Sequence, residues 1–343
     1  MPKFELTRAR AITADVLYVA ALPRKADANV PFTRVCQFYQ GKWDRADVDV
    51  ATQRICLYHR PEGGRIAVYM SPEGQLFSPE PSFRGSRIVN SALATSKKLG
   101  RLADLRQVGK YLVACGDGGQ TYRQRDDGGW VPLDLGVFDD RVDSTWAFAI
   151  RAPNVKTFAE EEVYFDNHPT EKAELDRRVK SYMANLMLHA IHGLSVDELY
   201  FCGKDGAVYF WNGHSSGKIT VPTSSFLGDI LVEDAETVWI CGRDGTLLRG
   251  SAKRGFTAIP CDGSPQFSTI TSFKGAIFLS SYAQPRGAFV YDGQRIRQVS
   301  SGLRQELDDV HTVDGVTDAL WAVGSNAIAR FDGATWEQIP LPK

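Results

Sequence analysis

Alternating apolar and polar residues recur along this chain as pairs of short strands joined by tight turns. The clearest pair is Leu199–Gly213, where an alternating run lies on each side of an Asp-Gly dipeptide. This pattern is the strongest short-range indicator of a β-hairpin. Related hairpins are predicted at Leu112–Tyr122, Val238–Leu248 and Leu320–Gly333. A hairpin that recurs in this way indicates a repeat architecture.

The hairpins recur with a spacing of about 40 residues, which is typical of a β-propeller with four strands per blade. Three further strands, Leu17–Ala21, Ile66–Met70 and Ala276–Ser281, complete the series and bring the number of repeats to seven. The sequence therefore predicts an all-β fold. We expect residues 1–343 to form a single domain, a seven-bladed β-propeller of four-stranded antiparallel blades. Its chain ends should be adjacent, and its last blade should have an outer strand of its own.

The period is interrupted between the third and fourth repeats. The surplus residues, 136–182, are predicted to form a partly helical insertion on the face of the propeller. Two apolar runs in it, Trp146–Ile150 and Glu162–Phe165, are each compatible with a strand. Thr170 is the expected N-cap of a helix whose apolar residues follow helical spacing. The insertion is either an amphipathic helix packed on the rim or a lid or binding arm, because long insertions are often functional.

The charge balance argues against two classes of partner. The chain has 40 Lys and Arg against 41 Asp and Glu, which gives a net charge of −1. It therefore lacks the basic surplus that attracts nucleic acid or an anionic membrane surface. No apolar run is long enough to cross a bilayer. We expect no nucleic-acid partner, no membrane partner, and a protein that is monomeric by itself.

Three of the six cysteines, Cys115, Cys202 and Cys241, occupy one column of the repeat, where Met70 and Val323 stand in other repeats. This interchange indicates small buried apolar side chains rather than metal ligands or disulfides. The N-terminal residues show no signal-peptide pattern, and the sequence contains no C-x-x-C. The expected location is therefore the reducing cytoplasm.

The third to seventh repeats resemble known proteins well and the first two resemble them poorly, as residues of the fourth and seventh repeats illustrate. The residues concerned are Gly193, Ser195, Asp197, Gly203, Gly206, Trp211 and Gly213 in the fourth repeat and Trp321, Gly324, Asp332, Gly333 and Trp336 in the seventh. They resemble bacterial β-propellers of the sialidase-repeat and photosystem-assembly-factor-like groups. The run Asp332–Trp336 is one residue shorter than a sialidase Asp-box, and the catalytic arginines and Tyr/Glu pair of sialidases are not seen. The resemblance implies a fold and, at most, a binding role.

Two catalytic sequence motifs are missing, because neither H-E-x-x-H nor a P-loop occurs. His189 and His311 occupy equivalent inner-strand positions, so both could approach the central channel. A shared metal ion is not expected, because their blades are not neighbours. Asp205 and Asp244 resemble a carboxylate pair, but a tight turn itself favours Asp there. We assign no catalytic residue, no metal ligand and no cofactor.

These observations favour a non-enzymatic protein-binding propeller. In concrete form we expect a bacterial immunity or inhibitor protein that blocks a partner toxin or enzyme. The alternative is an enzyme, a hydrolase or lyase acting on a carbohydrate or small molecule in the propeller funnel. Because strands reverse at each turn, the insertion and the turns between the second and third strands should share one face. The candidate partner-binding residues there are Trp146, Tyr164, Arg177, Arg178, Tyr182, Lys204, Asp205, Arg243 and Asp244.

Overall fold

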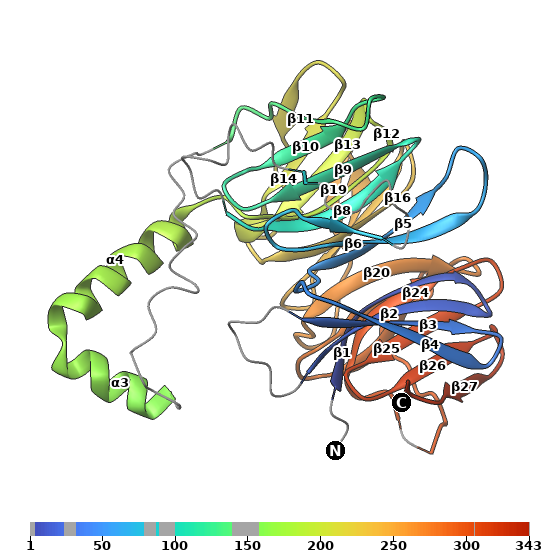
Figure 1. Ribbon diagram of the computed structural model, residues 1–343. Coiled ribbons are helices and arrows are strands. Elements are labelled where there is room, and N and C mark those ends of the chain that lie inside the picture. The colour runs from blue at the N-terminus through green and yellow to red at the C-terminus, as the bar shows by residue number, and fades with distance from the viewer. Residues whose placement is uncertain are drawn as a thin grey trace.

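The computed structural model of the protein describes residues 4–23, 32–78, 87–88, 100–138, 158–304 and 306–342, without the side chains of residues 158, 159 and 182. Its strands form seven antiparallel sheets, each built from strands that follow one another along the chain. The first strand of each sheet contacts the first strand of the next, and the series closes from the seventh sheet back to the first. The fold is therefore the predicted seven-bladed β-propeller (Figure 1).

Six blades contain four strands each, and their bounds are as follows. Blade one contains β1 (Phe4–Thr13), β2 (Val16–Pro23), β3 (Thr33–Tyr39) and β4 (Lys42–Val48). Blade three contains β8 (Leu102–Val108), β9 (Tyr111–Gly116), β10 (Thr121–Gln124) and β11 (Trp130–Pro132). Blade four contains β12 (Leu188–Ser195), β13 (Glu198–Gly203), β14 (Val208–Trp211) and β15 (Ser216–Lys218).

The last three blades repeat the same order. Blade five contains β16 (Leu227–Asp234), β17 (Thr237–Gly242), β18 (Leu247–Ser251) and β19 (Gly255–Ala258). Blade six contains β20 (Phe267–Phe273), β21 (Ala276–Ser281), β22 (Gly287–Tyr291) and β23 (Ile296–Gln298). Blade seven contains β24 (Val310–Gly315), β25 (Leu320–Gly324), β26 (Ile328–Phe331) and β27 (Trp336–Ile339).

Blade two has three strands within the described residues, β5 (Arg54–His59), β6 (Arg65–Met70) and β7 (Leu76–Phe77). An isolated antiparallel bridge between Gln75 and Arg87 adds one more pairing to this region. In several blades the second strand is buried along almost its whole length rather than at alternate residues. In β13, β17 and β21 every residue after the first is buried, because each blade packs against a neighbour on both faces.

The Asp-Gly turns have the geometry that the sequence predicts. In blade four, Asp205 and Gly206 both adopt positive φ, at 56° and 65°, and the Ala207 N–H donates to the Lys204 carbonyl at 3.1 Å. Such a two-residue turn matches the twist of the flanking strands. A Cβ on Gly206 would lie 2.1 Å from the Thr223 carbonyl oxygen, so the position also requires glycine for space. The turn therefore sits directly on the crossover to blade five.

Hydrogen bonds from inner-strand side chains to the next blade run around the channel, and we call them the inter-blade belt. At five joints a side chain accepts a hydrogen bond from a backbone N–H of the next inner strand. These pairs are Asp104 with Ile191, His192 with Val232, Asp229 with Ile270, Thr269 with Val313, and Asp314 with Ala11. Arg8 joins blade one to Gln53 at 2.9 Å, and Gln107 joins blade three to His59. The belt thereby satisfies backbone groups that a sheet edge would leave unpaired.

The ring closes without a shared strand, as expected. Blade one and blade seven each consist of four consecutive strands. The joint between them includes a hydrogen bond from the Leu6 N–H to the Ser325 carbonyl at 3.2 Å. The indole N–H of Trp43 donates to the Pro340 carbonyl at 2.7 Å, which ties the outer parts of the two blades together. The first and last described segments accordingly pack together, because Phe4 and Leu6 share a core cluster with Ile339 and Leu341.

The insertion follows β11 and precedes β12, and its described part contains two helices, α3 (Phe158–Asn167) and α4 (Pro169–Ala184). The prediction of a strand at Glu162–Phe165 was wrong, because this run lies within α3. Glu160 and Glu161 in the first turn of α3 favour the helix through its dipole. The other predicted strand, Trp146–Ile150, lies outside the described residues. The helix α4 starts one residue before the expected N-cap Thr170, with a proline in the first position.

The core lies between the blades, and the three equivalent cysteines belong to it. Cys115 packs with residues of blade four, Cys202 with residues of blade five and Cys241 with residues of blade six. All three side chains have no exposed surface. Burial raises the pKa of each thiol well above its ordinary value. The prediction of buried thiols is confirmed.

We expect a thiol-specific reagent to distinguish these cysteines in the native protein. Cys261 is partly exposed and should react first, whereas Cys115, Cys202 and Cys241 should react only after unfolding in guanidinium chloride. Mass spectrometry of peptides from timed samples would measure this order. Labelling of any of the three before Cys261 would show that the joints between blades open in the native state.

The belt also predicts a dependence of stability on pH. His192 Nδ1 accepts a hydrogen bond, and burial followed by the charge of Arg106 lowers the pKa of this side chain to about 3. The unfolded chain, with an ordinary histidine pKa of about 6.5, binds the additional proton as the pH falls. Stability should therefore be lost below pH 6.5, by about 1.4 kcal/mol per pH unit from this residue.

The variant His192→Asn retains an acceptor near Nδ1 but does not titrate. Urea unfolding between pH 7 and pH 5 should show a shallower loss of stability for this variant than for the parent. His214→Asn is the matched control, because His214 is exposed on a turn. Equal pH dependence of His192→Asn and the parent would contradict the role of this histidine.

Candidate functional site

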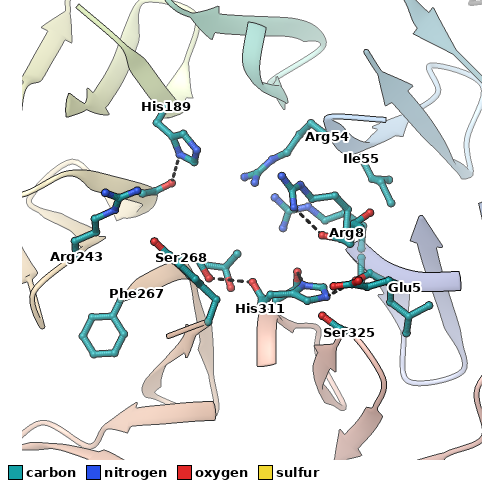
Figure 2. Close-up of a pocket in the computed structure, with 18 of the residues that line it drawn as sticks. Glu5, Arg8, Arg54, Ile55, His189, Arg243, Phe267, Ser268, His311 and Ser325 are labelled. Atoms are coloured by element: carbon teal, nitrogen blue, oxygen red, sulfur yellow. Dashed lines mark hydrogen bonds between the residues drawn. The ribbon is translucent and has the colours of Figure 1, made fainter. Parts of the chain in front are cut away.

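The inner strands carry a β-bulge near their start that shapes the central channel. The bulge occurs in the inner strands of all blades except blade two, where the described register is regular. His189, Ser268 and His311 are bulged residues of blades four, six and seven. Their equivalence places both histidines beside the channel, as the sequence predicts (Figure 2). Bulges redirect side chains in this way at many functional sites.

Four charged side chains form a buried ionic cluster inside the channel. Arg54 of β5 lies 2.6 Å through Nε from Asp104 Oδ1 of β8. Arg106 donates to Asp104 Oδ2 at 3.0 Å and also to Asp229 of β16. Burial alone would raise the pKa of Asp104, but the charges of Arg54 and Arg106 hold it well below its usual range. The two arginines and two aspartates therefore neutralise one another, and they link blades two, three and five.

One end of the channel widens into a cavity of about 400 Å³. We call it the channel pocket, and we define it by Arg8, Arg54, His189, Arg243, Ser268 and His311. Figure 2 shows Arg8 and Arg54 reaching inward on one side, with His189, Arg243 and Ser268 on the other sides. Arg243 lines the pocket and belongs to the turn that follows β17, between the second and third strands of blade five. The pocket therefore opens on the face of the propeller that carries these turns.

The two histidines of the channel pocket are held by backbone carbonyls. His189 Nδ1 lies 2.8 Å from the Gly228 carbonyl of the next blade. His311 Nε2 lies 2.9 Å from the Leu6 carbonyl across the ring closure. Burial lowers the pKa of His189, and burial followed by the charge of Arg8 lowers the pKa of His311 to about 4. Both imidazoles are therefore neutral at pH 7, and they serve the joints between blades.

The opposite end of the channel opens into a second cavity of about 620 Å³. Its lining includes Arg10, Arg65, Lys274, His192 and Asp314. Arg10 lies 3.5 Å from Asp314, whose other oxygen accepts the Ala11 N–H. This end is more open to solvent than the channel pocket. Its Arg10 and Asp314 side chains pair with each other, and Asp314 also belongs to the inter-blade belt.

The candidate residues of the insertion lie on the pair of helices. Tyr164 stacks on His168 with ring centroids 4.0 Å apart, and its hydroxyl donates to Glu171 at 2.8 Å, so it fastens α3 to α4. Arg177 and Arg178 both donate to Glu174, and these bonds lower the pKa of Glu174 to about 2. Trp146 and the side chain of Tyr182 lie outside the described residues.

The candidate residues of the turns divide between two places. Lys204 donates through Nζ to the Met183 carbonyl at the end of α4, which connects the insertion to the turn of blade four. Asp205 and Asp244 have positive φ, so the turn geometry accounts for both, and Asp244 also accepts from the Ser225 hydroxyl at 2.9 Å. Arg243 lines the channel pocket. The structure thus connects Lys204 with the insertion and places Arg243 at the channel.

The base of the insertion is also fixed to blade three. Asn185, just after α4, accepts the Gly118 N–H through its side chain at 2.9 Å. The Leu186 carbonyl accepts the Gly119 N–H at 3.2 Å. Beyond this base, α3 and α4 extend away from the strands (Figure 1). The predicted position of the whole insertion, 136–182, on this face stays a prediction.

Sequence reasoning missed the arginines of the channel. Arg8 and Arg10 alternate with apolar residues in β1, and Arg54 is the first residue of β5, before the apolar residues Ile55, Cys56 and Leu57. A charged residue in the first strand of a predicted blade was the available signal, because that strand lines the axis. Their partners could not be inferred, because these lie on other blades far away in sequence.

The described residues give no sign of a metal centre or a membrane span. Among them, no group of three or more His, Cys, Asp and Glu side chains is arranged to hold a metal ion. The helices that the structure describes are too short or too polar to cross a bilayer.

No protein-family model matches the chain. It is 24% identical over 334 residues to the immune protein Tsi7 of Pseudomonas aeruginosa, a match that covers 95% of this chain and 94% of that protein. Among solved structures it resembles YCF48 from Cyanidioschyzon merolae, with a TM-score of 0.58 and 12% identity over 96% of this chain and 95% of that one.

A second similar structure is the WD40 β-propeller domain of Doa1, with a TM-score of 0.60 and 10% identity over 95% of this chain and 92% of that one. At such low identity, the solved structures show the fold alone. They agree with the fold-level resemblance seen in the sequence. The chain is thus similar over nearly its whole length to an immune protein, and it shares the β-propeller fold with proteins of other kinds.

Proposed function

We propose that this protein is a non-enzymatic protein-binding propeller that acts as an immunity protein and blocks a partner toxin or enzyme. The observation that carries the proposal is the similarity to Tsi7, which extends over 95% of this chain and 94% of that protein. Protein binding is a role that rigid, loop-lined propeller faces suit well.

The insertion supplies the surface that we propose for the partner. Val163 of α3 is 61% exposed and Met183 of α4 is 50% exposed, so the apolar side chains of these helices are not all packed against the ring. Arg177 extends from the same pair of helices. Exposed Met and Arg side chains are enriched where proteins bind one another. These exposed side chains favour a binding arm over a helix packed on the rim. We call the helices α3 and α4 the arm.

The arm and the turns form one proposed binding face. Lys204 contacts the end of α4, and the turn of blade three contacts the residues just after it. A partner held by the arm would therefore lie over the turns that carry Asp205, Arg243 and Asp244. We place this activity in the cytoplasm, since the six cysteines are all free thiols, as in a reducing compartment.

Deleting the arm tests the proposal directly. A variant with residues 140–182 replaced by a short Gly-Ser linker should keep the ring folded, because the blades close on one another without it. It should fail to retain the partner that the parent captures from the source cell, as measured by pull-down and mass spectrometry. Circular dichroism and thermal unfolding would check the fold. Partner binding that survives the deletion would place the function on the opposite face or in the channel.

A finer test reverses two charges on α4. The double variant Arg177→Glu and Arg178→Glu should weaken partner binding at least tenfold, since Arg is enriched among residues that dominate interfaces. Its melting temperature should change little, because exposed ion pairs contribute little to stability. Arg295→Glu with Arg297→Glu is the matched control on the outer part of blade six, where Arg297 also pairs with an aspartate. Equal losses of affinity in both double variants would indicate a general charge effect.

A further inference from the structure

Arginine side chains outnumber carboxylates among the described residues that line the channel pocket. Within the ionic cluster, Arg54 and Arg106 are matched by Asp104 and Asp229. Arg8, Arg10 and Arg243 add three further positive charges to the walls of the pocket, and of these Arg10 is paired with Asp314. Glu5 is the one carboxylate among the described residues that line it. The pocket therefore has the electrostatic character of an anion site.

Arg8 is the most informative of these residues because its side chain is half-buried and is bonded to backbone carbonyls rather than to a carboxylate. Its Nε donates to the Gln53 carbonyl at 2.9 Å and its Nη1 to the Thr7 carbonyl at 2.7 Å. No described carboxylate lies within ion-pair distance of it. Burial and then the charge of Arg54 lower the pKa of Arg8 to about 10, so it remains charged at pH 7. A charge that is partly removed from water and has no counterion is unfavourable, and a bound anion would reduce this cost.

Arg243 approaches the pocket from the turn of blade five. Its guanidinium lies 4.9 Å from the ring centroid of Phe226, which orients the side chain without neutralising it. No described carboxylate forms an ion pair with it. Two guanidinium groups that face one cavity from different blades suit a carboxylate or phosphate, because the arginine fork can donate two parallel hydrogen bonds to either.

We propose that the channel pocket binds an oxyanion, a carboxylate or phosphate group held between Arg8 and Arg243. A cavity of about 400 Å³ accommodates a small organic acid or a phosphate monoester. The same group could instead be an acidic side chain presented by a protein that covers this face. The first source is independent of the proposed function, whereas the second rests on it.

Isothermal titration calorimetry at low ionic strength tests the pocket with three probes: citrate, inorganic phosphate, and an acetylated tetraglutamate peptide. We expect binding at one site with a dissociation constant below about 1 mM, in the range of a modest ligand pocket. Binding of citrate or phosphate identifies a free anion as the ligand. Binding of the peptide alone identifies a carboxylate presented by a polypeptide. Absence of binding by all three probes overturns the proposal.

Variants locate the site within the molecule. Arg243→Gln should weaken binding at least tenfold without altering the fold, because this residue is on an exposed turn. Arg249→Gln is the matched control, since Arg249 is also exposed in blade five and lies 5.0 Å from the ring of Trp239. Arg8→Met should abolish binding, and circular dichroism would check that it folds. If Arg243→Gln and Arg249→Gln bind alike, the site is elsewhere and the proposal is wrong.

The outcomes separate this proposal from the proposed function. Anion binding that is lost in Arg243→Gln, in a protein that captures no partner, would support the pocket and count against immunity. Partner capture by a protein that binds none of the probes would support the immunity function and overturn the anion site.

Discussion

The structure depends on hydrogen bonds that cross from each inner strand to the next. Asp229 shows the principle, because one carboxylate accepts the backbone N–H groups of Ile230 and Ile270 and also pairs with Arg106. Each blade thereby supplies the partners that its neighbour lacks at the axis. Removing one member of such a buried charged pair typically costs about 3–5 kcal/mol, so the arrangement fixes the blades in one relative position. The rigid pocket at the channel end is a consequence of this order.

The fold could be predicted because the signals for it are local. An Asp-Gly turn such as Asp205-Gly206 and the apolar strands beside it lie within a few residues, and their recurrence counts the blades. The insertion was harder, because a short apolar run such as Glu162–Phe165 is compatible with a strand or a helix. The neighbouring residues favour the helix. Acidic residues lie in its first turn, and at its end the Asn167 side chain donates a hydrogen bond to the Val163 carbonyl.

The candidate site was only partly accessible from the sequence. The equivalence of His189 and His311 could be read from the repeat, since both occupy the same place in a blade. The channel charges could not be paired, because Asp104 and Ile191 are 87 residues apart and Asp229 and Ile270 are 41 apart. Such contacts exist only once the ring has closed. The sequence placed Arg243 on a turn, and the structure shows that this turn borders the channel.

The closure between blades one and seven has a consequence for how the ring forms. Trp321 donates to the Thr13 carbonyl across a separation of 308 residues, whereas the strands within a blade are neighbours in sequence. Contacts of such high contact order are slow to form, because a long loop must be ordered first. The seam between the first and last blades therefore joins the parts of the chain that are most distant in sequence, whereas each blade is built from neighbouring strands. The pocket that Arg8 and His311 share is formed across this seam, so it requires the ring to be closed.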